Sequence, residues 1–173
     1  MTMKILRVYI RAVEKLTRII ALTVSVLMPA MVCVLGYEVV SRYIFGRPTV
    51  WAFDVSIFMF GYTGLLAGAY VHRLREHINV DIVYGRVSPR KRAVLDLVNG
   101  LLILYFIILT IMTTWGPAFD AIVNHETRPG EWAPPIGHYK LMIPAGAFLI
   151  LLQQISNWIK SLYLAITGKE MIP

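Results

Sequence analysis

Residues 55–92 of the chain, VSIFMFGYTGLLAGAYVHRLREHINVDIVYGRVSPRKR, change abruptly from apolar to basic. The apolar half carries Gly61, Gly64 and Gly68 at helical spacing, and the basic half ends in Arg90-Lys91-Arg92. Glycine disfavours a soluble helix, but small residues in a bilayer allow two helix backbones to approach closely. The stretch therefore predicts a membrane span with a glycine packing face, followed by a basic segment at the membrane boundary.

The composition of the 173-residue chain agrees with a membrane protein. Only 16% of its residues are charged and 57% are hydrophobic, whereas soluble domains have about 25% charged residues. The net charge of +7 comes from Lys and Arg that flank apolar runs, so the positive-inside rule explains it better than nucleic-acid binding does. The single cysteine, Cys33, allows no internal disulfide and no cysteine-based metal site.

Hydrophobic runs predict an all-α integral membrane protein with four transmembrane helices in one membrane domain, residues 1–173. The expected spans are residues 19–40, 55–71, 94–115 and 141–164. Pro29 should kink the first span by freeing the carbonyl of Ser25. Pro89 suits the first residue of the third helix, and Pro117 predicts a kink or stop at its far end.

Two further segments are expected at the membrane surface. Residues 3–18 form a basic amphipathic helix, which favours the anionic cytoplasmic interface. The segment between the second and third spans mixes basic and apolar residues and is expected to lie along the same interface. The candidate anchors at the cytoplasmic interface are Arg73, His77, Asp81, Arg90, Lys91 and Arg92.

The distribution of Lys and Arg predicts the orientation of the chain. Thirteen of them lie in the N-terminal segment, the second loop and the C-terminal tail, and four lie in the first and third loops. The N-terminus and the C-terminus are therefore expected in the cytoplasm.

Polar residues near the spans suggest packing and docking rather than catalysis. Glu38 and Arg42 have the spacing of a helical ion pair, which is either purely interfacial or part of a partner-docking surface. Asp54 is favoured at a helix N-terminus and has Arg42 and Arg47 as possible partners. The amides of Gln153, Gln154 and Asn157 suit interhelical hydrogen bonds. Gln153 and Asn157 share a face of the fourth span, which is expected to be buried against protein.

No cofactor, metal or enzymatic activity is expected of this chain. Transport and redox subunits carry ionisable residues or paired histidines at membrane depth, whereas the histidines here lie in loops or at span ends. His77 and Asp81 have metal-ligand spacing but lack a third ligand. What remains is a small accessory subunit that packs against a larger membrane partner.

One pattern resembles a known family, the small membrane subunit (DctQ-like) of tripartite ATP-independent periplasmic (TRAP) transporters. It consists of Ser41-Arg42-Tyr43-Ile44-Phe45-Gly46-Arg47-Pro48, then Trp51, Asp54, Gly68-Ala69 and Arg73…His77-Ile78-Asn79-Val80-Asp81. The four-span layout and the Pro-Arg-Lys-Arg start of the third helix are similar as well.

The resemblance implies a scaffold subunit of the bacterial inner membrane that packs against a large transport subunit. A periplasmic substrate-binding protein would deliver an organic anion, such as a carboxylate or sugar acid. A sodium gradient would drive uptake, with the sodium and substrate sites in the large subunit. Candidate contacts with the binding protein are then Glu38, Arg42, Arg47 and Asp54. The glycine face of the second span and the amide face of the fourth would contact other membrane helices.

The sequence leaves two other functional classes open for this protein. An autonomous four-span carrier would act as a homodimer and use Glu38 as its coupling carboxylate, so Glu38→Gln would abolish its activity. The anchor subunit of a redox complex would bind haem and show a Soret band.

Overall fold

A computed structural model describes residues 2–74 and 89–168, with side chains described for residues 3–74 and 94–168. The helices are α1 (Thr2–Ser25), α2 (Leu27–Tyr43), α3 (Ala52–Arg73), α5 (Pro89–Val123) and α6 (Gly137–Thr167). Within the described residues, four helical stretches are long and apolar enough to cross a membrane: Met3–Tyr43, Ala52–Arg73, Val94–Val123 and Gly137–Thr167. The predicted all-α fold with four spans is confirmed.

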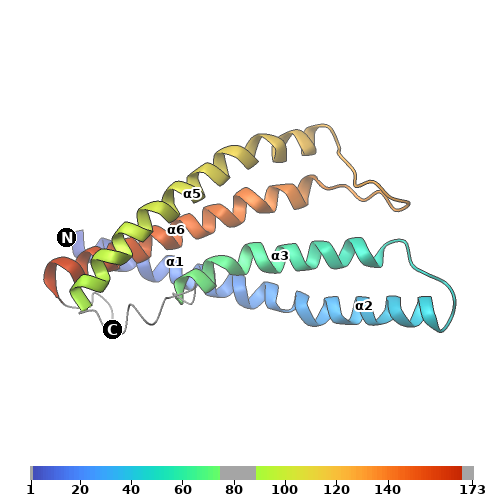
Figure 1. Ribbon diagram of the computed structural model, residues 1–173, viewed down its shortest axis with the longest axis horizontal. Coiled ribbons are helices and arrows are strands. Elements are labelled where there is room, and N and C mark those ends of the chain that lie inside the picture. Colours follow the sequence, from blue (N-terminus) through green and yellow to red (C-terminus); the bar gives the residue numbers. More distant parts are fainter. Residues whose placement is uncertain (1, 75–88, 169–173) are drawn as a thin grey trace.

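The long helices form an open layer in the order α5, α6, α3 and α2, with α1 crossing beside α3 and α6 (Figure 1). One end of the layer carries the connecting segments 44–51 and 124–136, and we refer to it as the loop end. The other end, the terminal end, holds the start of α1 and the end of α6 (Figure 1). Helices α2 and α5 are the two edges, so much apolar surface faces outward.

The sequence predicted an amphipathic helix that ends at residue 18 and a first span that begins at residue 19, but the structure divides this region elsewhere. Helix α1 continues through Arg18 to Ser25, and the interruption comes at Val26, before α2. Pro29 explains this position, because it has no N–H to donate to the carbonyl of Ser25 and its ring crowds that carbonyl. The interruption agrees with the predicted kink. It also makes the amphipathic segment 3–18 part of one rod with the first span.

The third helix begins at Pro89, as predicted, but it does not stop at Pro117 and runs on to Val123. A proline removes one backbone hydrogen bond, and packing against a neighbouring helix can offset that loss. Here Ala118 and Ala121 are both 1% exposed, and Gly137 at the start of α6 approaches the backbone of Ala121. The interfacial segment predicted after the second span falls largely on residues 75–88, which lie outside the described residues.

Candidate functional site

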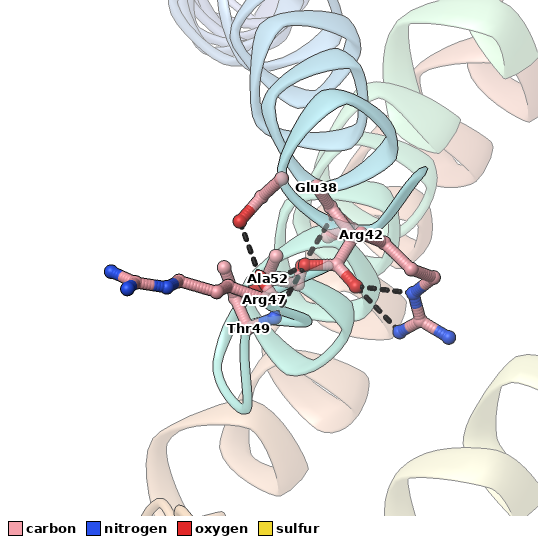
Figure 2. A network of polar contacts seen from close by, with 7 residues as sticks. Glu38, Arg42, Arg47, Thr49 and Ala52 are labelled. Carbon is pink, nitrogen blue, oxygen red and sulfur yellow. Dashed lines mark hydrogen bonds and ion pairs between the residues drawn. The ribbon is translucent and has the colours of Figure 1, made fainter. Parts of the chain in front are cut away.

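The carboxylate of Glu38 lies in a polar cluster at the loop end (Figure 2). Its Oε1 accepts hydrogen bonds from Nε (2.8 Å) and Nη2 of Arg42, one turn later on α2. Its Oε2 accepts from the backbone N–H (2.9 Å) and from the hydroxyl of Thr49. Bonds to a charged acceptor are among the stronger ones in proteins. Glu38 therefore fastens the segment 44–51 to the end of α2.

The two arginines of this cluster have different environments. The Arg42 guanidinium is held by Glu38, although its side chain is 52% exposed. The Arg47 guanidinium points away from the cluster (Figure 2), while the Arg47 backbone N–H donates to the carbonyl of Ser41 (3.0 Å). Gly46, with φ +63°, adopts the left-handed conformation that this turn requires. Of the two cations, Arg47 is the one that presents its charge outward.

Asp54 pairs with Arg128, a residue of the segment between α5 and α6. Oδ1 of Asp54 lies 2.9 Å from Nη1 of Arg128, and the two side chains are 10% and 29% exposed. The guanidinium also lies 5.3 Å from the centre of the Phe53 ring, a cation–π distance. This pair replaces the partners considered from the sequence, Arg42 and Arg47. Nothing in the sequence indicated that Arg128 is the partner of Asp54, because the two residues lie far apart along the chain.

The segment 124–136 is ordered by its own backbone. The N–H of Arg128 donates to the carbonyl of Pro134, and the N–H of Ile136 donates to the carbonyl of Glu126, both at 2.9 Å. The side chain of Trp132 is 42% exposed. The loop end thus presents two fixed segments, one held by Glu38 and one by Asp54.

The three glycines of the predicted packing face on α3 have different surroundings. A Cβ at Gly61 would overlap the ring of Tyr139 on α6, and a Cβ at Gly68 would lie 3.5 Å from Cδ1 of Ile150. A Cβ at Gly64 would meet nothing within 4 Å. Two of the glycines therefore face α6, and Gly64 faces out of the layer.

The tightest backbone approach between α3 and α6 involves a glycine outside the predicted packing face. A Cβ at Gly146 would lie 2.7 Å from the carbonyl oxygen of Leu65. Gly100 of α5 has a similar role, since a Cβ there would lie 2.8 Å from Cδ1 of Trp158 on α6. Neither glycine is part of a small-residue repeat, so the sequence carried no signal for these contacts.

The amide of Gln153 joins three helices near the terminal end. Gln153 is fully buried, and its Oε1 accepts from the hydroxyl of Thr17 on α1 (3.4 Å). Its Nε2 donates to Oδ1 of Asn157 (3.1 Å), whose Nδ2 donates to the carbonyl of His72 at the end of α3 (3.2 Å). The structure thus places Gln153 and Asn157 together on a buried face.

The next amide, Gln154, faces the other side of α6. It is 4% exposed, and its Nε2 donates to the carbonyl of Gly100 on α5 (3.1 Å). Its Oε1 contacts Nε2 of His72. One turn before Gly100 on α5, the carbonyl of Leu97 accepts a hydrogen bond from the Trp158 indole N–H (3.1 Å). Two adjacent glutamines therefore tie α6 to three other helices.

An ion-pair cluster also lies at the terminal end. Oε1 of Glu14 on α1 pairs with Nζ of Lys160 on α6, and its Oε2 lies 3.6 Å from Nη2 of Arg73 on α3. The Arg73 guanidinium also lies 5.8 Å from the centre of the Tyr70 ring. Arg73, a predicted interface anchor, therefore contacts protein. The other predicted anchors, His77, Asp81 and the side chains of Arg90, Lys91 and Arg92, lie outside the described residues.

The charged groups of the described chain lie at the two ends of the layer, and the polar groups between them are amides and hydroxyls that join helices. Within residues 2–74 and 89–168, no group of three or more His, Cys, Asp or Glu side chains is placed to hold a metal ion. The arrangement is suited to holding helices together and to presenting surfaces at both ends.

Comparison with known proteins identifies relatives of this chain. The family described as "Tripartite ATP-independent periplasmic transporters, DctQ component" matches residues 31–163. The C4-dicarboxylate TRAP transporter small permease protein DctQ of Vibrio cholerae serotype O1 is 28% identical to the chain over 92 residues. The aligned part covers 53% of this chain and 40% of that protein, so the chain spans about two fifths of the relative's length.

Proposed function

Because this chain belongs to the DctQ component family of the tripartite ATP-independent periplasmic transporters, we propose that it packs as an accessory subunit against a large transport subunit. Family membership and the four apolar helices indicate a multi-pass protein of the bacterial inner membrane. The proposed assembly takes up an organic anion delivered by a periplasmic binding protein. Uptake is coupled to sodium, with the ion and substrate sites in the large subunit. The C4-dicarboxylate named for the Vibrio cholerae relative belongs to the same class of substrate.

The observation that carries this proposal is the open space in front of two glycines. A Cβ added to Gly36 on α2 or to Gly64 on α3 would meet nothing within 4 Å. The close helix contacts within the chain use other glycines, such as Gly146. Small residues in a membrane permit the backbone of another helix to approach. Gly36 and Gly64 therefore support a partner helix at the edge formed by α2 and α3.

On the opposite edge of the layer, one of the two glycines of α5, Gly116, is open in the same way. The exposed side chains of α5 are bulky, and they include Leu101, Leu102, Tyr105, Phe106 and Met112. The edge formed by α2 and α3 exposes bulky side chains as well, such as Tyr37 and Phe60, but it carries two open glycines, and helix interfaces in membranes are enriched in small residues. We therefore assign the outer face of α5 to lipid and the edge formed by α2 and α3 to the large subunit.

The loop end is proposed to face the periplasm and the binding protein, with both termini in the cytoplasm. Glu38 and Asp54 would act there indirectly, because their carboxylates are engaged by Thr49 and Arg128. The outward guanidinium of Arg47 is the cation of the Glu38 cluster best suited to direct contact (Figure 2).

Affinity purification of the full-length chain from its native membrane in mild detergent tests the proposal. A many-spanning partner should co-purify. Gly64→Ile should remove that partner, because the larger side chain fills the open face. Gly116→Ile is the matched control, because a Cβ at Gly116 on α5 also meets nothing within 4 Å; it should retain the partner. A chain that purifies alone or as a homodimer would overturn the proposal.

Among the described residues, no specific contact favours the two other classes considered from the sequence. A coupling carboxylate has to exchange its ligands, whereas both oxygens of Glu38 are engaged by Arg42 and Thr49. Axial haem ligands in such an anchor face each other within the spans, whereas the described histidines lie at the ends of the layer: His72 at the end of α3, His125 in the segment 124–136 and His138 at the start of α6.

A further inference from the structure

Helix α1 has one face that is committed to the protein. Ile10, Val13, Thr17 and Ala21 recur at intervals of three and four residues and are at most 8% exposed. The Tyr9 hydroxyl adds a hydrogen bond to the carbonyl of Leu152 on α6 (3.1 Å). These contacts fix the rotation of α1 about its own axis. They thereby determine which of its other residues point outward.

All the basic residues of α1 lie on a second face. This basic stripe consists of Lys4, Arg7, Arg11, Lys15 and Arg18, and every one of them is exposed. Their spacing of three and four residues places them on one side of the helix, over about 21 Å at 1.5 Å per residue. Within the described part of the chain, none of the five forms an ion pair.

The acid of this helix does not neutralise the stripe. Glu14 has a helical spacing to Arg11 and Arg18 that allows intrahelical pairs. Its carboxylate turns inward instead, where Lys160 and Arg73 take its two oxygens. Because of these tertiary ion pairs, the stripe retains its positive charge.

An apolar strip borders the basic stripe around the helix. Its members Ile5, Val8, Leu16 and Ile19 are 61%, 68%, 43% and 51% exposed. An acidic protein surface would complement the charges alone. A ligand with an anionic head and an apolar tail complements both surfaces. From this juxtaposition we propose that α1 is a binding site for anionic phospholipids, with phosphate groups along the basic stripe and acyl chains against the apolar strip.

Native mass spectrometry of the delipidated full-length chain tests this site. Titration with phosphatidylglycerol should give tighter binding than titration with phosphatidylcholine of the same acyl chains. Each cation near an anionic lipid surface contributes about fivefold to binding. The triple variant Arg7→Gln, Arg11→Gln, Lys15→Gln should therefore bind phosphatidylglycerol on the order of 100-fold more weakly.

Two control variants separate the lipid site from general effects of charge or folding. Arg7→Lys, Arg11→Lys, Lys15→Arg keeps the charge and should bind phosphatidylglycerol like the wild type. Arg47→Gln removes an exposed cation at the loop end and should also leave binding unchanged. The proposal is overturned if phosphatidylcholine binds equally well, if the triple glutamine variant binds phosphatidylglycerol like the wild type, or if Arg47→Gln is equally impaired. Because no transport is measured, the outcome is independent of the proposed transporter role.

Discussion

Adding a single methyl group at Gly146 is expected to destabilise the contact between α3 and α6. A Cβ at this position would lie 2.7 Å from the carbonyl oxygen of Leu65, whereas ordinary contacts begin at 3.4 Å. The two helices would have to separate locally by about 0.7 Å, because the obstructing atom belongs to the backbone and cannot rotate away. Over-packing of this kind costs about 1–3 kcal/mol of unfolding free energy.

Gly64→Ala is the matched control for Gly146→Ala. Both substitutions replace a helical glycine by alanine, which adds up to about 1 kcal/mol of helix stability in each case. A Cβ at Gly64 meets nothing within 4 Å, so the propensity gain cancels in the comparison and the clash remains. Gly146→Ala should therefore be less stable than Gly64→Ala by about 1–3 kcal/mol.

Thermal unfolding of the purified full-length variants in detergent, followed by far-ultraviolet circular dichroism, measures this difference. For a chain of this size, 1 kcal/mol corresponds to about 2–4 °C in Tm. The Gly146→Ala variant should therefore melt at least about 2 °C below Gly64→Ala. A Gly146→Ala variant that melts at or above Gly64→Ala would refute the close approach of the two backbones.

Three further predictions concern the loop end. Glu38→Gln should increase the hydrogen-exchange rate of the Thr49 amide, because the weaker acceptor loosens the segment 44–51, and it should have only a modest effect on uptake by the proposed assembly. A double-mutant cycle of Asp54→Asn and Arg128→Gln, measured by thermal unfolding, should give a coupling energy of about 0.5–3 kcal/mol. A cysteine in place of Glu126 should react with a membrane-impermeant thiol reagent in intact cells, because the charge distribution predicts that this segment lies outside.

Each of these three experiments has a control and a contradicting outcome. Arg47→Gln is the control and should leave hydrogen exchange at the Thr49 amide unchanged. Unchanged exchange in Glu38→Gln would argue against the hydrogen bonds from Thr49 to the Glu38 carboxylate. Additive effects in the double-mutant cycle would mean that the ion pair contributes no coupling. The labelling experiment requires a background without Cys33. Labelling of a cysteine at Arg90, with none at Glu126, would reverse the predicted orientation.

The sequence by itself determined which segments form helices that are long and apolar enough to span the membrane. Bilayer thickness sets the length of an apolar run, and proline removes a particular backbone hydrogen bond, so both signals are local. The span within α3, the start at Pro89 and the interruption near Pro29 were therefore predictable. The pattern from Ser41 to Asp81, together with the four-span layout, was sufficient to indicate the family, because both can be read directly along the chain.

Only the tertiary structure decided which residues meet. Asp54 pairs with Arg128, and Glu14 pairs with Lys160, although other arginines lie closer to each acid along the chain. In the same way, Gly146 rather than Gly64 supplies the close approach between helices. Helical periodicity assigns a residue to a face of its own helix, but it does not say which helix will cover that face. That choice depends on how α1, α3 and α5 are arranged around α6, which no local pattern in the chain encodes.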